Sequence, residues 1–451
     1  MPSSPSSLRL PPGGDQACGR RPAAGGRPVR GAGPLAVAIL LLSGCGTSPS
    51  APAAASFDDP AEIAAVEGSD RSALFRDVRI VDPSTGDVRA GRSVLVADGR
   101  IARVGPTAVV QGPEGAAVVE GGGRYLVPGL ADMHVHLSRE DLPRYLESGV
   151  TTVRNLWGHP AIREMIDRVA AGELPGPTVR SVSPGIDAHP ERWPYTQFVD
   201  RPEEAAGVVA ALEEAGWRTL KVYQDLSRAS YDAVVAEARA RGLALVGHVP
   251  TDVDLFRVLD AGQRSVEHLA GYARELDPAG RRGPAGWAAA EMDGMRALAD
   301  RTAGTGTWIC PTLAIQLELG RSLSEDARRA GAEHRRRAVA ELHRAGVPLL
   351  VGTDAGIEVV APGASIHVEL AELVASGLSH REAMRAATEG AAAYFAAADE
   401  FGAVRVGLRA DLLLLAGNPY ADVGALRRLH GVMVRGRWRS TAEGWDGAFD
   451  G

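Results

Sequence analysis

Two histidines separated by one residue, His134 and His136, are the side chains of this sequence best suited to chemistry. They lie in the largely apolar run of residues 129–137, which is typical of a buried β-strand. Because alternate residues of a strand point to the same side, both imidazoles can bind one metal ion. For an isolated His-x-His pair, two buried histidines bonded to the backbone are the commoner arrangement. The choice between these readings depends on the rest of the chain.

Four later segments share one pattern, in which a short apolar strand carries a potential metal ligand at its end and a loop follows. The residues concerned are Lys221, His248, His268 and Asp354. Zinc prefers imidazole nitrogen and carboxylate oxygen, and a catalytic zinc site keeps one position open for water. The set therefore predicts a metal site at the ends of successive strands. A helix N-cap is the alternative for Asp354 taken alone.

Lys221 is the unusual member of this set, because an ammonium group is repelled by a divalent cation. A lysine among metal ligands should therefore be neutral or chemically altered, and burial lowers its pKa in the same direction. A neutral amine can add carbon dioxide. The carbamate that results is an anion with two oxygens, which can hold a second metal ion. A neutral or a carboxylated lysine at position 221 is therefore compatible with the predicted metal site.

The elements that must position these residues begin after residue 122, where the sequence changes to a rhythm of strand, loop and helix. This rhythm is typical of a parallel sheet. Eight strands are expected, around residues 134, 153, 182, 221, 248, 268, 309 and 351. The prediction is an α/β fold, a TIM-type (β/α)8 barrel over residues 125–399. In such barrels the chemistry lies at the C-terminal ends of the strands, where all the candidate ligands stand.

The two ends of the sequence predict a second, smaller domain. Short alternating strands fill residues 72–104, and the Asp98-Gly99 pair indicates a hairpin turn. The sequence after residue 402 returns to strands. We therefore expect residues 71–124 and 400–440 to form one small composite β-sandwich.

Composition limits the partners of the protein. The 451 residues are 45% hydrophobic, which is enough for a large core, and the formal net charge is −7. This charge gives no electrostatic reason to expect binding to nucleic acid. A small organic molecule is the expected partner. The sequence gives no oligomeric state.

The first residues predict export. Arginines precede the apolar run of residues 34–42, which has the length of a signal-peptide core and is too short to span a bilayer. The Leu-Ser-Gly-Cys that follows resembles a bacterial lipobox with Cys45 as the lipidated residue. An ordinary cleavage site with an incidental cysteine is the alternative. We expect a signal peptide over residues 1–45, a flexible tether over 46–70, and a lipoprotein anchored at the periplasmic or cell-surface face of a membrane.

Several further segments carry a family resemblance. They are Val-Pro-Gly-Leu at 127–130, Gly-Val-Thr-Thr-Val-Arg at 149–154 and Gly-Leu-Arg-Ala-Asp-Leu at 407–412. With the ligand segments, they make the chain from about residue 72 to 438 similar to the amidohydrolase superfamily, and within it to the binuclear imidazolonepropionase-like and prolidase-like (Xaa-Pro dipeptidase-related) hydrolases. The resemblance implies two zinc ions per chain. Their implied ligands are His134, His136 and Asp354 for the first ion, His248 and His268 for the second, and a carboxylated Lys221 as the bridge.

The implied activity is hydrolysis of an amide C–N bond, with dipeptides or N-acyl amino acids as the leading substrates. A hydroxide bridging the two ions attacks the carbonyl carbon, and Asp354 takes its proton and passes it to the departing amine. Hydrolysis of a cyclic amide, a lactone or an organophosphate on the same site is the alternative. A metal-free, surface-displayed binding lipoprotein is the alternative from another class. Lys221 argues against the single-metal deaminases, which lack that lysine.

Residues for substrate recognition are less specific in the sequence. Tyr223 lies on the same strand face as Lys221, where its hydroxyl could bond the carbonyl or a carboxylate of the substrate and assist catalysis. A buried structural tyrosine is the alternative. His189 lies in a loop that approaches the substrate in relatives, with a plain surface position as the alternative, and His367 heads a helix after the last strand, at a place typical of the family. Arg154 could bind a carboxylate or form an internal ion pair. The remaining cysteine, Cys310, is expected to be a buried, inert thiol.

Overall fold

The computed structural model describes residues 72–357 and 359–441. The predicted signal peptide, the lipidated Cys45 and the tether lie outside the described residues. Within the described part, no helix combines the length and the apolar character needed to cross a bilayer.

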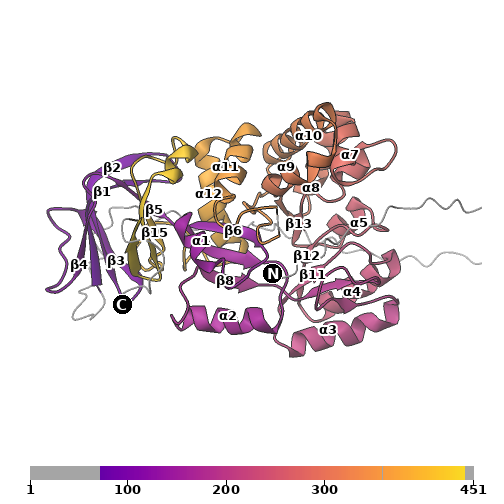
Figure 1. Cartoon of the computed structure of the whole chain (residues 1–451), viewed down its shortest axis with the longest axis horizontal. Helices are drawn as coiled ribbons and strands as arrows, with labels where there is room; N and C mark the ends of the chain where they lie inside the picture. Colours follow the sequence, from indigo (N-terminus) through magenta and orange to yellow (C-terminus); the bar gives the residue numbers. More distant parts are fainter. Residues whose placement is uncertain (1–71, 358, 442–451) are drawn as a thin grey trace, which may run out of the picture. The chain divides into compact units, whose positions relative to one another are not determined.

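Strands from both ends of the described chain share one sheet, in the order β17-β16-β15-β5-β1-β2-β3, with β4 paired to β1. Figure 1 shows the early strands beside β15, which comes from the end of the chain. The turn at Asp98 and Gly99 joins β2 to β3, and both residues have positive φ, as the sequence predicts for a two-residue hairpin. The strands are β1 Ser72–Val81, β2 Val88–Ala97, β3 Arg100–Pro106, β4 Ala117–Glu120, β5 Tyr125–Pro128, β15 Leu412–Leu415, β16 Leu429–Val434 and β17 Arg437–Ser440.

The expected β-sandwich of two sheets is present as one continuous sheet of these strands. The reason lies in β1, whose pairing with β2 shifts register between Phe75 and Val78 and again between Val78 and Ile80. Residues before the first shift pair with β4, and Arg79 and Ile80 pair with β5. Strand β1 thus pairs with β4 along its first part and with β5 along its last part. Because β1 is shared in this way, all the strands stay in one sheet.

All pairs in the remaining sheets are parallel. One sheet has the order β6-β7-β8 and the other has the order β10-β9-β11-β12-β13-β14. These strands are short, and β6, β7, β9 and β13 are buried along their whole length, as expected where helices cover a parallel sheet. The strands of the two sheets are β6 Leu130–Val135, β7 Val150–Asn155, β8 Thr178–Ser181, β9 Gly185–Asp187, β10 Gln197–Phe198, β11 Thr219–Val222, β12 Ala244–Gly247, β13 Ser265–Glu267 and β14 Trp308–Cys310.

Backbone hydrogen bonds connect these two parallel sheets. The Ser183 amide donates to the Thr219 carbonyl at 2.9 Å, at the junction of β8 and β11. Residues 349–355, predicted as the last strand, instead form isolated bridges to β14 and to β6. Asp354 has a φ of 61°, a left-handed conformation that interrupts strand geometry. The structure thus has two regular parallel sheets joined by a segment, where the sequence predicts one ring of eight regular strands.

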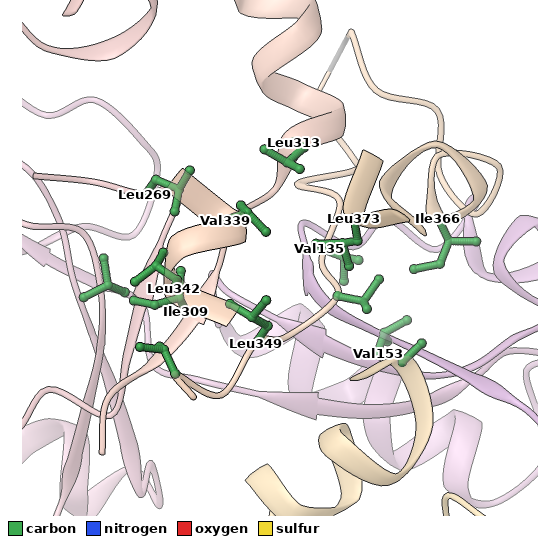
Figure 2. Packing of buried hydrophobic residues seen from close by; sticks show 14 of the residues in the cluster. Val135, Val153, Leu269, Ile309, Leu313, Val339, Leu342, Leu349, Ile366 and Leu373 are labelled. Atoms are coloured by element: carbon green, nitrogen blue, oxygen red, sulfur yellow. The ribbon is translucent and has the colours of Figure 1, made fainter. Parts of the chain in front are cut away.

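Helices follow most of the parallel strands and bury one face each. On α10, the buried Val339 and Leu342 lie three residues apart and pack with Ile309 and Leu349 in the main hydrophobic cluster (Figure 2). The α-helices are α1 Leu142–Glu147, α2 Pro160–Ala170, α3 Ala205–Glu214, α4 Arg228–Ala240, α5 Leu255–Asp260, α6 Tyr272–Leu276, α7 Gly283–Ala289, α8 Met295–Ala303, α9 Leu313–Leu319, α10 Glu325–Arg344, α11 Ile366–Ala375, α12 His380–Arg385 and α13 Ala391–Tyr394. Shorter turns are η2 Pro202–Glu204, η3 Met292–Gly294, η4 Gly320–Ser322, η5 Ala386–Gly390 and η6 Val423–Arg427.

Candidate metal centre

A cavity of about 580 Å³ opens at the carboxyl ends of the parallel strands. Five of the six predicted metal ligands line it, and the sixth, His134, contacts one of them from β6. Each comes from the end of a different strand or from the segment that joins the sheets. The five lining residues are His136, Lys221, His248, His268 and Asp354.

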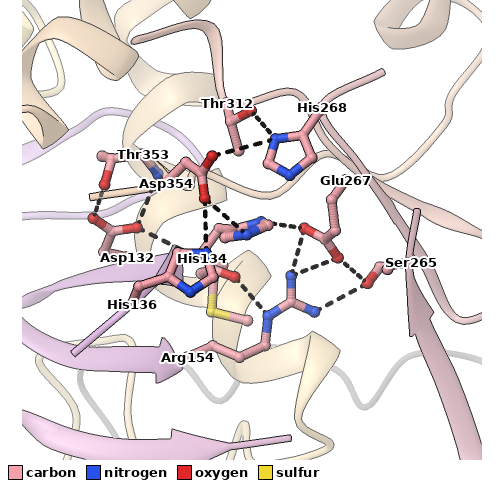
Figure 3. A network of polar contacts seen from close by, with 12 residues as sticks. Asp132, His134, His136, Arg154, Ser265, Glu267, His268, Thr312, Thr353 and Asp354 are labelled. Carbon is pink, nitrogen blue, oxygen red and sulfur yellow. Dashed lines mark hydrogen bonds and ion pairs between the residues drawn. The ribbon is translucent and has the colours of Figure 1, made fainter. Parts of the chain in front are cut away.

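Asp354 lies at the centre of the histidines. Its Oδ1 lies 3.1 Å from Nε2 of His134 and 3.0 Å from Nε2 of His136, and its Oδ2 lies 3.9 Å from Nδ1 of His268 (Figure 3). The ring of His248 stands edge-on to that of His268, with centroids 4.8 Å apart. One carboxylate and three imidazoles therefore lie close together, and His248 adjoins this group through His268.

The environment of His134 fixes its tautomer. Its Nδ1 lies 2.9 Å from Oε2 of Glu267. Arg154 and His134 hold the pKa of Glu267 well below its usual range, outweighing the effect of burial, so this carboxylate is ionised and can only accept. His134 must then donate from Nδ1, which leaves Nε2 as the ring atom that can bind a metal ion.

That Nε2 atom is buried and has no hydrogen-bond partner, although Asp354 is only 3.1 Å away. A lone pair facing a carboxylate oxygen at this distance is repulsive unless a cation lies between them. His134, His268 and Asp354 each offer one ligand atom within 4.8 Å of the others. The donor set therefore fits a divalent metal ion.

The other imidazoles are neutral at physiological pH. Burial lowers the pKa of His136, and it lowers the pKa of His268 to about 3. The pKa of His248 lies well below its usual value, because the ring is buried and Lys221 is near. Neutral imidazoles expose the lone pairs that metal ligation needs, so no proton has to leave these rings before a metal binds.

Lys221 is buried at 1% exposure, and burial lowers its pKa to about 8 against the opposing effect of Glu267 and Asp354. Space for its side chain depends on Gly247 of the next strand. A Cβ at that position would lie 3.0 Å from Cδ of Lys221 and 2.2 Å from the carbonyl oxygen of Val222. The structure thus holds an amine that loses its proton near neutral pH beside the histidine cluster.

Strained backbone aims two of the predicted ligands. His268 and Asp354 have φ of 63° and 61°, conformations that side-chain-bearing residues rarely adopt. Asp132 holds the segment around Asp354 by accepting from the amide and the hydroxyl of Thr353, at 3.0 and 2.6 Å. These hydrogen bonds to Asp132 offset the strain of the left-handed backbone. Strain of this kind is typical of functional sites and is uncommon in loops that serve packing alone.

Comparison with known proteins decides the family. The model of the amidohydrolase family matches residues 125–439. The chain belongs to this family. Among solved structures, it is similar to a putative prolidase from Bifidobacterium longum, with a TM-score of 0.66 and 26% identity, over 82% of this chain and 94% of that one. It is also similar to a bottromycin amidohydrolase, with a TM-score of 0.65 and 28% identity, over 83% and 88% of the two chains.

Curated relatives match shorter parts of this amidohydrolase. An adenine deaminase from Mesorhizobium japonicum is 34% identical over 111 residues, which are 22% of this chain and 18% of that enzyme. A dihydroorotase from Geobacter is 42% identical over 64 residues, which are 14% of each protein. The chain therefore spans less than a fifth of the curated relatives named here.

Two acidic residues that position the amidohydrolase site escaped the sequence analysis. Glu267 is fully buried between Arg154 and His134, and Asp132 is fully buried against Thr353. Both residues could have been found in the sequence, because each is an acid inside an otherwise apolar strand. A buried carboxylate must have a hydrogen-bond or ion-pair partner, so such an acid indicates a polar contact in the core. Glu267 directly precedes His268, and Asp132 directly precedes Met133. The sequence analysis predicted these two strands from their apolar residues and gave the acids no role.

Arg154 forms the internal ion pair that the sequence left as the alternative to substrate binding. Its Nη2 lies 3.0 Å from both carboxylate oxygens of Glu267, and its Nη1 donates to the hydroxyl of Tyr394 at 2.7 Å. Arg154 is 1% exposed and is not among the described residues that line the cavity. The prediction that Arg154 binds substrate is therefore corrected: its guanidinium neutralises Glu267 and supports His134 from behind.

The structure places the other substrate-binding candidates differently. Tyr223 lines the cavity, with its ring 4.3 Å from that of His248. His189 stacks on Phe198 and lies 2.6 Å from Asp200, with a mostly exposed side chain. His367 is half-buried, and burial and Arg427 lower its pKa to about 4. Neither His189 nor His367 is among the described residues that line the cavity.

A second group of ligand atoms lies on the inner side of His134, formed with Glu267 and Cys310. Burial raises the pKa of the Cys310 thiol well above its usual value, so it stays protonated and neutral. Nδ1 of His134 is already bonded to Glu267. Glu267 and Cys310 therefore have a structural role. The ring nitrogen of His134 that can bind a metal ion is Nε2, on the side of Asp354.

Replacing Glu267 by glutamine tests this support. Glu267→Gln removes the charge that fixes the His134 tautomer, and we expect zinc affinity to fall by about 10- to 100-fold. Competition with a chromophoric chelator measures the change. Glu372→Gln is the matched control, because Glu372 also accepts two bonds from one arginine, Arg336, outside the cavity. Unchanged zinc affinity in a folded Glu267→Gln protein would contradict the role given to this carboxylate.

Proposed function

We propose that this amidohydrolase hydrolyses an amide C–N bond of a small molecule with the help of two zinc ions. Dipeptides and N-acyl amino acids are the leading substrates. One observation carries the proposal: four imidazoles, an ionised Asp354 and an amine of lowered pKa are gathered at or beside one cavity. The solved structures similar to this chain include enzymes titled prolidase and amidohydrolase, which supports an amide as the substrate class.

In this proposal His134, His136 and Asp354 hold one ion, and His248 and His268 hold the other. A carboxylated Lys221 bridges them. When bound, such a pair supplies a water of lowered pKa and polarises the substrate carbonyl. The fit rests on the buried Nε2 of His134, which has no hydrogen-bond partner and lies 3.1 Å from a carboxylate oxygen of Asp354.

The composition gives separate support for a reacting lysine. Lys221 is the only lysine in the sequence, and the other 48 of the 49 basic residues are arginines. An arginine stays protonated in proteins and does not form a carbamate, whereas a neutral lysine amine can. The chain thus uses arginine everywhere except at the one buried position where the proposed chemistry requires an amine.

Two side chains of the cavity act on the substrate in this proposal. Asp354 is ionised, because His268 and His134 hold its pKa well below its usual range despite burial. It can therefore take a proton from the attacking water and pass it to the departing amine. The hydroxyl oxygen of Tyr223 accepts a bond from Nε1 of Trp193 at 2.8 Å. Its own O–H remains available to donate to the carbonyl or a carboxylate of the substrate.

Finer points of architecture and location belong to the same proposal. The strands and the segment at residues 349–355 make up a (β/α)8 barrel over 125–399, supported by the bonds that join the two parallel sheets. Residues 71–124 and 400–440 form the second domain. Export and a lipid on Cys45 anchor the enzyme to a membrane, supported by the sequence of residues 34–45.

The test combines metal content with hydrolysis. Elemental analysis should give about two zinc ions per chain, and a library of N-acyl amino acids and dipeptides should yield released amine. Adenine belongs in the library because adenine deaminases are among the partial matches. A protein without metal after zinc supplementation would support the binding lipoprotein instead, and deamination of adenine alone would overturn the amide proposal.

Carboxylation of Lys221 has a predicted pH dependence. With a pKa of about 8, the amine of the metal-free protein loses its proton as pH rises, so about a tenth is neutral at pH 7 and about nine tenths at pH 9. At constant dissolved ¹³CO2, we expect the NMR signal of the carbamate to grow several-fold over this range. Lys221→Met is the control, because any remaining signal then comes from the chain's α-amine. A spectrum at pH 9 without a Lys221-dependent carbamate would contradict the bridge.

A further inference from the structure

Two arginines, Arg274 of α6 and Arg282 just before α7, line the same cavity. Nη1 of Arg274 donates to the carbonyl oxygens of Thr251 at 2.9 Å and Val253 at 3.2 Å. Nη2 of Arg282 donates to the same Thr251 carbonyl. Neither guanidinium forms an ion pair with any carboxylate of the described residues.

The two guanidinium groups keep most of their donors unused. An arginine presents five N–H groups in a planar fork, which matches the geometry of a carboxylate. Within the described part of the chain, Nε and Nη2 of Arg274 and Nε and Nη1 of Arg282 have no protein acceptor. Because both residues line the cavity, these donors are available to a ligand bound there.

The two guanidinium groups lie close enough to influence each other. Both cations are held by one carbonyl oxygen, and burial together with Arg274 lowers the pKa of Arg282. Of the two acids that act on Arg282, Asp252 has the larger effect and is exposed, and Asp225 is paired with Arg192; neither lines the cavity. An anion between the two guanidinium groups would remove their repulsion and satisfy their donors.

The rest of the cavity wall is aromatic and carries one acid. Trp157, Trp193 and Tyr195 line it, and Trp193 and Tyr195 are 44% and 52% exposed. Asp354, a proposed metal ligand, is the one acidic residue among the described residues that line the cavity. The wall thus offers an apolar surface and two cations, and it offers no free carboxylate to receive an ammonium group.

We propose that Arg274 and Arg282 bind the free carboxylate of the substrate, and that the substrate is an N-acyl amino acid with an apolar acyl group and not a dipeptide with a free ammonium. This assignment rests on the proposed amide hydrolysis and narrows its substrate class. In this arrangement the aromatic residues contact the acyl group. The two arginines favour substrates that carry a negatively charged carboxylate.

Binding of a compound that cannot be hydrolysed tests the arginine pair independently of activity. The probes are N-benzenesulfonylglycine and its neutral carboxamide, titrated against the zinc-loaded enzyme by quenching of the tryptophan fluorescence. We expect the carboxylate to bind about 30-fold more tightly than the carboxamide, as bidentate pairs with arginine allow. In Arg274→Gln/Arg282→Gln the two probes should bind equally. Arg218→Gln should keep the preference, because Arg218 also bonds only backbone carbonyls but lies outside the cavity.

Several outcomes overturn the assignment. They are equal affinity in the unmodified enzyme, a preference that persists in the double variant, and the absence of binding by the carboxylate at millimolar concentration. If circular dichroism shows that the double variant is unfolded, Arg282→Glu decides, since Arg282 is exposed and the charge reversal must lower the preference by at least about 10-fold.

Hydrolysis then separates this proposal from the proposed function. We expect kcat/KM for N-benzoylglycine to exceed that for phenylalanylglycine by at least about 10-fold. The reverse order overturns the assignment of an N-acyl substrate. A protein that prefers the anionic probe but hydrolyses no amide would keep the arginine site and reject the proposed amide hydrolysis.

Discussion

Asp354→Asn should abolish amide hydrolysis, with kcat reduced by about 10³- to 10⁴-fold. The asparagine keeps the shape of the side chain but can neither take up a proton nor neutralise a cation. Three histidines face this carboxylate within 3.9 Å, so the change removes the one negative charge that they share. Zinc content should fall with the activity, because Asp354 is also a proposed ligand. Steady-state kinetics and elemental analysis on the same preparation measure both effects.

Asp232→Asn is the matched control for this variant, since Asp232 pairs with Arg257 away from the cavity. Its activity and zinc content should match those of the unmodified enzyme. An Asp354→Asn protein that keeps both zinc and a kcat within about 10-fold would exclude Asp354 as ligand and as proton carrier.

Lys221→Met should lower kcat/KM by at least about 10³-fold and reduce zinc from about two ions per chain to one. Methionine has nearly the length of lysine and fits a buried position, but it cannot form the proposed bridging carbamate. The remaining ion should be the one that the proposal assigns to His134, His136 and Asp354. Metal analysis after gel filtration and hydrolysis of N-benzoylglycine provide the measurements.

Lys221→Arg distinguishes the proposed chemistry from a simple electrostatic role. If position 221 served only to place a positive charge near Glu267 and Asp354, arginine would preserve function. If the neutral amine is required, arginine should be as inactive as methionine, because it stays protonated. An active Lys221→Arg enzyme would therefore remove the bridge from the mechanism.

Several features of the site were predictable from sequence because they depend on local chemistry. The strand period places His134 and His136 on one side, and apolar runs that end in His248, His268 and Asp354 mark the carboxyl ends of parallel strands. The amidohydrolase resemblance was likewise carried by local segments, and the family match confirms it. The Asp98-Gly99 turn required only two residues with positive φ.

Other features depended on which strands become neighbours. Arg154 and Glu267 are 113 positions apart, and only the packing of β7 near β13 makes them an ion pair. The unpaired lone pair of His134 follows from that contact. The irregular pairing of β1 and the left-handed Asp354 likewise reflect interactions between segments that no local pattern encodes.

The sequence by itself determined the family and the types of side chain available at the strand ends, because periodicity and composition are local properties. Only the tertiary structure decided how those side chains share protons and charge. It turned Arg154 inward to Glu267, left Arg274 and Arg282 without acids, and lowered the pKa of Lys221 to about 8 by burial. Burial and long-range contacts set these properties, and both arise only when distant segments pack together.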